Sequence, residues 1–356
     1  MRSPLARVEA FCERFGLRLP VVLAPMAGAS PTSLSAAVAN AGGAGACGAV
    51  LMQPASIVSW AAELRSATSG PFQINLWIPD PPAHRDAAHE SAVRAFLGQW
   101  GPTVSPSAAE VTRPDFAAQC EALLDAAPPI VSSIMGLYPP DFVGRLKQRG
   151  ISWWANISTV AEARAAEDAG ADVIVAQGME AGGHRGRFDA SRTEADMVGL
   201  FALLPAVADA VRVPVVATGG IADARGVAAA LLLGASAAQI GTGFLRCPEA
   251  QIPSAWAHAL GRTLPEDTVI SRAFSGRAGR SVATAYARAA TAPGAPAPAP
   301  YPVQRGLTQA MRDAAVKVND LDRMQAWAGQ SAMLACAEPA ADVARVLWEG
   351  ARTQLR

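Results

Sequence analysis

The stretch Glu167–Ala176, EDAGADVIVA, leads from polar, helix-like sequence through one glycine into an unbroken apolar run. A second stretch, Leu232–Gly241, LLGASAAQIG, repeats this arrangement. Glycine suits the left-handed position that closes a helix, so each stretch predicts a helix, a tight turn and a strand. The runs are apolar throughout and do not alternate, which is typical of strands covered on both faces of a parallel sheet.

Eight runs of this kind are expected to be strands, and helix signals separate most of them. The expected strands are Leu19–Ala24, Ala44–Val50, Phe72–Ile78, Ile130–Met135, Ile151–Asn156, Asp172–Ala176, Pro214–Ala217 and Ala237–Gly241. Thr159 and Glu162 have the spacing of a capping box, and Asp223 precedes a helix expected over Ala224–Leu233. Strands alternating with helices predict an α/β fold, a TIM (β/α)8 barrel, with a doubly wound open sheet as the alternative.

The length of 356 residues exceeds the roughly 250 that a barrel needs. We therefore expect the barrel in residues 1–245, with an excursion at 79–114. Residues 246–326 are expected to form a smaller, mostly helical cap or lid that includes the Pro/Ala-rich segment 291–302, which cannot be helical. Residues 327–356 are expected to form a C-terminal helix that packs back on the barrel.

Composition excludes several classes of protein. Lys and Arg together number 30, as do Asp and Glu, and 51% of the residues are hydrophobic. This balance argues against a disordered chain, a nucleic-acid binder and a polybasic membrane-surface protein. The five cysteines form no CxxC pair and the N-terminus has no apolar signal region, so a cytoplasmic location is expected. The uncharged stretch Gly226–Leu245 is expected to be a buried helix, a turn and a strand, not a membrane span.

Three glycines, Gly43, Gly45 and Gly48, match the dinucleotide-binding pattern GxGxxG. That pattern binds a pyrophosphate only where it follows a strand and opens a helix. Here the glycines follow the helical stretch Leu34–Asn40 and run into a strand, so a helix-to-strand turn is predicted. No HExxH or similar metal-ligand spacing occurs, and no metal site is expected.

The segment Gln177–Gly186, QGMEAGGHRG, begins at the end of an expected strand, where barrel enzymes carry their chemistry. Its four glycines allow close approach of the backbone to a ligand. His184 is the candidate catalytic residue, since imidazole transfers protons near neutral pH and donates hydrogen bonds to anions. The alternative is a histidine that caps its own loop. Arg185 and Arg187 are expected to be solvated.

Two glycine-rich turns end the last two expected strands, at Thr218-Gly219-Gly220 and Gly241-Thr242-Gly243. Barrels bind phosphate groups at this place through backbone N–H groups, so a phosphate site is predicted. Asn75 and Met26 are near the ends of the third and first expected strands. A buried Asn needs a partner, which is either backbone or a cofactor.

These segments resemble the nitronate monooxygenase family, formerly called 2-nitropropane dioxygenases. The resemblance covers most of the chain, and the string EAGGH, Glu180–His184, is its most specific part. It also includes LAPMAG at Leu23–Gly28, FQIN at Phe72–Asn75, both glycine turns, FSGR at Phe274–Arg277 and WAGQ at Trp327–Gln330. After Arg277 the chain departs from the proline-containing form common in the family.

The resemblance implies a TIM barrel that binds FMN without a covalent bond, with His184 in the active site. The implied cofactor-binding residues are Pro25, Met26, Asn75, Gln177, Gly182, Gly183, Gly219, Gly220, Gln239, Gly241 and Thr242. The implied reaction is oxidation of alkyl nitronates, or of nitroalkanes, by oxygen to a carbonyl compound and nitrite. The expected partners are therefore a nitronate or similar small anion and oxygen, with no nucleic acid and no membrane.

Two other activities remain open from the sequence. Related enoyl reductases that use NAD(P)H carry the same glycine–histidine loop on the same flavin barrel. A flavin-free barrel isomerase or lyase could use the two glycine turns for a phosphorylated substrate.

Overall fold

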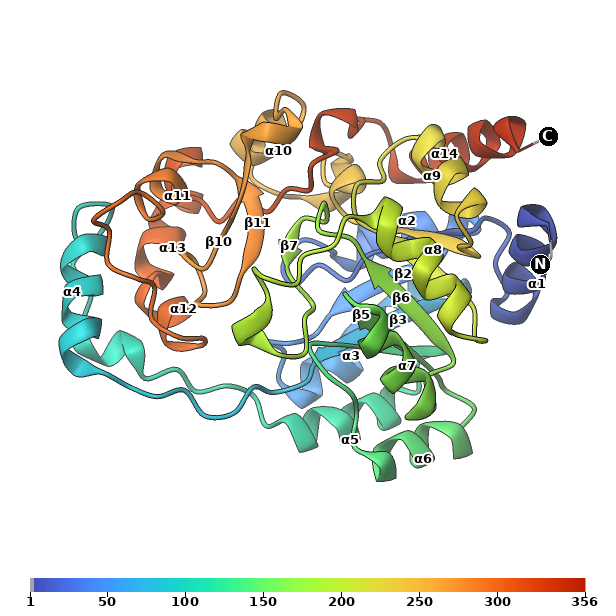
Figure 1. The fold of residues 1–356 in the computed structure, drawn as a ribbon, viewed down its shortest axis with the longest axis horizontal. Helices are drawn as coiled ribbons and strands as arrows, with labels where there is room; N and C mark the ends of the chain where they lie inside the picture. Colours follow the sequence, from blue (N-terminus) through green and yellow to red (C-terminus); the bar gives the residue numbers. More distant parts are fainter. Residues whose placement is uncertain (1–2, 356) are drawn as a thin grey trace.

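The computed structural model describes residues 3–355, and within them eight parallel strands form the centre of the molecule (Figure 1). The strands are β1 (Val21–Leu23), β2 (Gly45–Gly48), β3 (Phe72–Trp77), β4 (Ile130–Ile134), β5 (Ser152–Ile157), β6 (Val173–Gln177), β8 (Val215–Thr218) and β9 (Ala237–Ile240). Neighbours pair in the order β1-β9-β8-β6-β5-β4-β3-β2. The ends of this order also meet, because Leu23 N–H donates to the Ala44 carbonyl at 2.9 Å. The sheet is a closed TIM barrel, as predicted, and the open doubly wound sheet is excluded.

Helices cover the outside of the barrel. They are α2 (Thr32–Ala41), α3 (Pro54–Ala67), α5 (Phe116–Ala126), α6 (Pro140–Gln148), α7 (Val160–Asp168), α8 (Leu200–Ala210) and α9 (Ala224–Leu232). The predicted caps are present: Glu162 N–H donates to Thr159 Oγ1 at 3.2 Å, and Gly226 N–H donates to Asp223 Oδ1 at 2.9 Å. Gly234 turns the chain toward β9 with φ of +118°, a left-handed conformation that favours glycine.

Apolar side chains close the amino-terminal end of the barrel. Helix α1 (Pro4–Phe15) brings Phe11 and Phe15 against Trp154 of β5, with ring centroids 5.6 and 5.1 Å apart. Phe11 and Trp154 are buried in one cluster with interior residues of several strands. The interior of the barrel is therefore filled at this end, and its cavity lies at the carboxyl ends of the strands.

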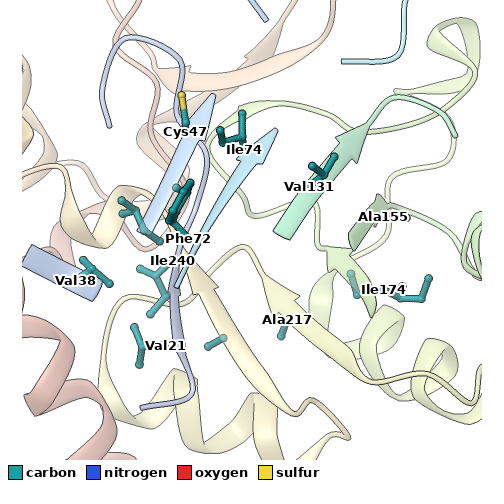
Figure 2. Close-up of a cluster of buried hydrophobic side chains, with 14 of the residues drawn as sticks. Val21, Val38, Cys47, Phe72, Ile74, Val131, Ala155, Ile174, Ala217 and Ile240 are labelled. Carbon is teal, nitrogen blue, oxygen red and sulfur yellow. The ribbon is translucent and has the colours of Figure 1, made fainter. Parts of the chain in front are cut away.

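Side chains along each strand alternate between the helices and the interior of the barrel. Ile74 packs in the apolar layer between strands and helices, part of which is drawn in Figure 2 together with Val21, Val38 and Ile240. Its neighbours Gln73 and Asn75 face the interior instead and line a cavity there. Strand β3 is buried along most of its length, as predicted, but it is not apolar throughout, because its interior sites near the carboxyl end carry polar groups.

A cap lies beside the barrel, on the left of Figure 1. Its elements are α4 (Ala87–Leu97), α10 (Ser254–Leu260), β10 (Thr268–Ser271), β11 (Gly279–Val282), α11 (Ala285–Ala289), α12 (Val303–Leu307) and α13 (Gln309–Lys317). The prediction of a mostly helical cap missed an antiparallel sheet in the order β10-β11-β7, in which β7 (Gly183–His184) belongs to the loop after β6. The sequence GRSV of β11 lacks the apolar pattern of a strand, and its partner β7 is distant in the chain.

The cap and the excursion at 79–114 share one apolar cluster. Val93 and Leu97 of α4 pack with Phe274, Tyr286 and Leu307 from the C-terminal half of the chain. The Pro/Ala-rich segment 291–302 contains no helix. The excursion therefore folds onto the cap, although its two ends leave and re-enter the barrel.

Helix α14 (Ala340–Gln354) packs against α2 and α9 on the outside of the barrel. Its close approach to α9 depends on Gly350, where a Cβ atom would lie 2.7 Å from the Cβ of Ala224. The uncharged stretch Gly226–Leu245 falls into α9, a turn and β9, as predicted. Among residues 3–355 no helix is both long enough and apolar enough to cross a membrane.

Candidate active site at the carboxyl end of the barrel

One cavity of about 610 Å³ lies over the carboxyl ends of the barrel strands. All of the predicted site residues line it, which brings together segments from much of the chain. They are Pro25, Met26, Asn75, Gln177, Gly182, Gly183, His184, Gly219, Gly220, Gln239, Gly241 and Thr242. Pro25 and Met26 follow β1, and Met26 approaches Gly241 so closely that a Cβ at that glycine would lie 3.3 Å from the Met26 sulfur.

The two glycine turns form one wall of this cavity. Gly219 and Gly220 have φ of +107° and +68°, and a Cβ at Gly219 would lie 3.0 Å from Ala181. In the described part of the chain, the N–H groups of Gly219, Gly220, Gly241 and Thr242 donate no hydrogen bond to the protein backbone. Unpaired N–H groups on adjacent turns are the arrangement that binds phosphate oxygens.

A tier of polar side chains from the strands lies inside the barrel mouth. Asn75 donates to Ser132 Oγ at 3.1 Å, so it has the side-chain partner that its burial requires. Gln177 accepts from Gly186 N–H at 2.7 Å and thereby ties β6 to the end of the histidine loop. Asn156 Nδ2 and Gln73 Oε1 are buried without a protein partner. A buried amide without a partner is costly, so these two atoms are suited to a ligand.

His184 lies in a slot between two indoles. Its ring centroid is 4.6 Å from that of Trp77 and 4.8 Å from that of Trp327, both in edge-on geometry. Its Nε2 lies 2.8 Å from the hydroxyl of Ser275, which is buried. The ring is thus fixed by contacts on three sides, and it lines the cavity.

The surroundings of His184 keep its imidazole neutral. Burial lowers the pKa of His184 from 6.5 to about 3, and the positive charges of Arg277, Arg185, Arg305 and Arg312 add to this effect. Protonation would place a further positive charge among these guanidinium groups, and no carboxylate of residues 3–355 forms an ion pair with the ring. His184 therefore meets a ligand at neutral pH as an uncharged hydrogen-bonding group or base.

Ser275 allows the neutral imidazole to take either tautomer. The serine hydroxyl is within hydrogen-bond distance of the Arg277 carbonyl, at 3.2 Å, as well as of His184. When the hydroxyl donates to that carbonyl, Nε2 carries the imidazole proton and Nδ1 offers a lone pair. When the hydroxyl donates to Nε2, Nδ1 carries the proton instead. His184 can therefore act as a base or as a hydrogen-bond donor.

Several cavity residues were missed from the sequence. The cap and the segment after it supply Ser275, Tyr301, Arg305, Arg312 and Trp327. The strings FSGR and WAGQ included two of them as parts of the family resemblance but gave no role. Their roles depend on the folding of the cap over the barrel mouth, which no local pattern indicates.

Arg185 corrects one expectation directly. Its side chain is not solvated: the residue is 4% exposed, and its guanidinium donates to carbonyls of its own loop. Arg187 is only partly exposed and pairs with Glu162 and Asp196. Gly43 lies in the turn from α2 into β2, and Gly45 and Gly48 are the first and last residues of β2, so these glycines follow a helix and run into a strand, as predicted. Within residues 3–355 no three His, Cys, Asp or Glu side chains gather as metal ligands.

The neutral state of His184 predicts an acid-sensitive fold. Unfolded His184 takes up a proton near pH 6.5 and the folded residue does not until about pH 3, so the free energy of unfolding falls as pH drops below 6.5. In His184→Gln this contribution is absent. The free energy of unfolding in urea should fall less from pH 7.5 to pH 5.5 in the variant than in wild type. The two proteins should differ by at most about 1.4 kcal/mol per pH unit. Equal losses in the two proteins would contradict a depressed pKa.

A closed barrel with a polar, histidine-bearing cavity at the carboxyl ends of its strands defines an enzyme that acts on a small molecule. A model of the family described as nitronate monooxygenase matches residues 9–350. A nitronate monooxygenase of Paraburkholderia phytofirmans is 39% identical over 94% of this chain and 93% of its own length. A nitronate monooxygenase of Pseudomonas aeruginosa is 37% identical over 97% of this chain and 99% of its own length. The solved structure of a nitroalkane oxidase from Streptomyces ansochromogenes is 38% identical, covers 96% of this chain and 98% of its own, and superposes with a TM-score of 0.87.

The chain belongs to the nitronate monooxygenase family, a family of oxidoreductases. Its relatives are named for oxidation of nitronates or nitroalkanes. The resemblance recognised from the sequence is thereby confirmed.

Proposed function

We propose that this chain oxidises alkyl nitronates with dioxygen to a carbonyl compound and nitrite, and that it holds FMN without a covalent bond. The observation that carries the proposal is the neutral imidazole of His184 in a cavity whose wall also offers unpaired N–H groups for a phosphate. The family relationship supports the reaction class.

The residues present fit FMN at both of its polar parts. Gly219, Gly220, Gly241 and Thr242 would hold the phosphate through backbone N–H groups, and the Thr242 hydroxyl adds a donor. The unpartnered Asn156 Nδ2 and Gln73 Oε1, with Asn75, Gln177 and Gln239 nearby, suit the hydrogen-bonding edge of a flavin ring. When bound, FMN supplies the electron transfer and oxygen chemistry that side chains lack.

His184 handles the charge of the substrate. With its proton on Nδ1, the neutral imidazole donates a hydrogen bond to an oxygen of the anionic nitronate. With Nδ1 unprotonated, it removes the proton on the carbon next to the nitro group of a neutral nitroalkane. Arg305 and Arg312 line the same cavity and attract anions to it. Trp77 and Trp327 pack against the imidazole ring of His184 and limit the access of water to it.

The reaction has a defined stoichiometry. Two nitronate anions and one dioxygen molecule balance as two carbonyl molecules and two nitrite ions, with no other reductant. The first test is the visible spectrum of the purified protein, which should show flavin absorption bands. Denaturation should release the absorbing molecule from the protein, with the size of FMN. The second is oxygen uptake with propyl-2-nitronate, which should yield two nitrite ions per dioxygen without any nicotinamide.

Other results would point to other activities. Rapid anaerobic bleaching of the flavin by NADH or NADPH, with no turnover of nitronate, would indicate an NAD(P)H-dependent enoyl reductase. A colourless protein that takes up no added FMN would support a flavin-free isomerase or lyase that binds a phosphorylated substrate.

A further inference from the structure

The guanidinium of Arg185 lies beneath the loop that carries His184. Its two terminal nitrogens donate to the carbonyls of Gly178 at 3.1 Å, Met179 at 3.2 Å, Ala181 at 2.5 Å and Gly183 at 3.1 Å. Arg185 is 4% exposed, it forms no ion pair with a carboxylate of the described residues, and its Nε has no hydrogen-bond partner there. The hydrogen bonds of this buried cation therefore all go to the backbone of its own loop.

The carbonyls held by Arg185 fix the direction in which the loop presents its N–H groups. In a trans peptide the C=O and the following N–H point in opposite directions. Ala181, Gly182, Gly183 and His184 line the cavity, whereas Arg185 does not, so the guanidinium lies on the far side of the loop. With the Ala181 carbonyl turned to Arg185, the N–H of Gly182 is turned to the cavity. This N–H has no backbone acceptor in the part of the chain that the structure describes.

Other contacts hold the loop at different points. Gly183 and His184 pair with β11, and Gln177 Nε2 donates to the His184 carbonyl at 3.2 Å. Arg280 Nε donates to the Met179 carbonyl at 3.1 Å, and Gln330 N–H donates to the Glu180 carbonyl at 2.9 Å. Glu180, the acidic residue of the loop, is engaged elsewhere, because its carboxylate accepts from Leu200 N–H at 2.8 Å. The carbonyls of Ala181 and Gly183, which flank the residues nearest the cavity, are both held by Arg185.

We propose that Arg185 is a positioning residue for the reaction: by holding the carbonyls of Gly178, Met179, Ala181 and Gly183, it aims the Gly182 N–H and the His184 ring at the ligand. The effect of Arg185 on turnover rests on the proposed function, whereas its effect on the geometry of the loop does not. A lysine at this position keeps a positive charge, but its single ammonium cannot span carbonyls on both sides of the loop. Arg185→Lys therefore keeps the charge but loses the simultaneous contacts to several carbonyls, and Arg185→Met loses both.

The experiment compares Arg185→Lys and Arg185→Met with wild type, using Arg192→Met as the matched control. Arg192 is an exposed arginine on the segment after the loop and does not line the cavity. The first readout needs no turnover: amide hydrogen exchange in a peptide that covers residues 178–184. We expect exchange to be at least about tenfold faster in both Arg185 variants, with α8 unchanged and Arg192→Met equal to wild type.

The second readout is FMN affinity, measured by quenching of flavin fluorescence, and the third is kcat/KM for propyl-2-nitronate. We expect an FMN Kd about tenfold higher and kcat/KM about a hundredfold lower in Arg185→Lys, with loss in kcat exceeding the change in KM. The pKa of His184, followed by nitrogen NMR, should stay low in Arg185→Lys and rise in Arg185→Met. The charges that remain around His184, namely Arg277, Arg305 and Arg312, are the same in both variants.

The possible outcomes separate the two proposals. If wild type binds FMN but does not oxidise nitronate, the proposed function fails, and hydrogen exchange with FMN affinity still decides the role of Arg185. If Arg185→Met does not fold, Arg185→Lys decides alone. If Arg185→Lys has the same amide exchange, FMN Kd and kcat/KM as wild type, the positioning role is overturned.

Discussion

His184→Ala should lower kcat/KM for neutral 2-nitropropane by about 10²–10⁴-fold, the range that a general base contributes. The reason is that His184 is a neutral imidazole in the wall of the cavity, fixed by Ser275, Trp77 and Trp327. The arginines nearby are permanently charged and cannot accept a proton from a carbon acid. We expect a smaller loss for propyl-2-nitronate, which loses a hydrogen bond from His184 but needs no base.

The matched variant for this prediction is Ser275→Ala. It removes the hydroxyl that lies 2.8 Å from Nε2 but leaves the imidazole in place. A smaller loss than in His184→Ala is expected, with FMN content equal in both proteins when judged from the ratio of visible to ultraviolet absorbance. Full turnover by a His184→Ala protein that retains FMN would remove His184 from the mechanism.

Gly182→Ala should disrupt the cavity with a single methyl group. A Cβ at this position would lie 2.6 Å from Gly329 N, 2.8 Å from Ala328 C and 2.8 Å from Thr242 Oγ1. Two of these atoms are backbone, which cannot move aside as a flexible side chain can. The histidine loop, the Gly329 segment and the Thr242 turn must therefore separate, and Gly329 N–H loses its 3.0 Å hydrogen bond to the Thr242 hydroxyl.

Overpacking of this kind costs about 1–3 kcal/mol. Since the displaced segments all border the cavity, we expect an FMN Kd about 10–100-fold higher, together with a lower melting temperature. Gly144→Ala is the control, because Gly144 lies exposed in α6 and an added methyl group would meet no atom within 4 Å. That variant should bind FMN as wild type does and melt no lower. Unchanged FMN affinity in Gly182→Ala would show that the three segments are looser than the structure describes.

The predicted strands and the glycine turns that end them came from local signals. An apolar run and a glycine that closes a helix, as at Gly170 and Gly234, act within a few residues, so the sequence alone displays them. The position of the candidate site followed from topology, because all carboxyl ends of parallel strands meet at one end of a barrel. Asn75, Gly219 and Thr242 could therefore be expected together although they are far apart in the chain.

The prediction that Arg185 is solvated was wrong, and the physical reason applies to any prediction of side-chain burial from sequence. A side chain is buried or exposed by the sum of its neighbours, and the neighbours of Arg185 include β11, which pairs with the histidine loop only after the cap has folded. An arginine whose terminal nitrogens donate to backbone carbonyls carries no partner signal in the sequence. A carboxylate nearby would have been the usual sign.

The barrel, the glycine turns, the family and the residues at the strand ends could all be inferred from the chain alone, since they depend on short-range patterns and on one rule of topology. The state of His184, by contrast, is set by the folded molecule. Its contact with Ser275 spans 91 residues, and its pKa of about 3 depends on burial and on four arginine side chains, three of them far away in the sequence. Desolvation and Coulomb interaction depend on distance in space, and the order of residues along the chain does not contain that distance.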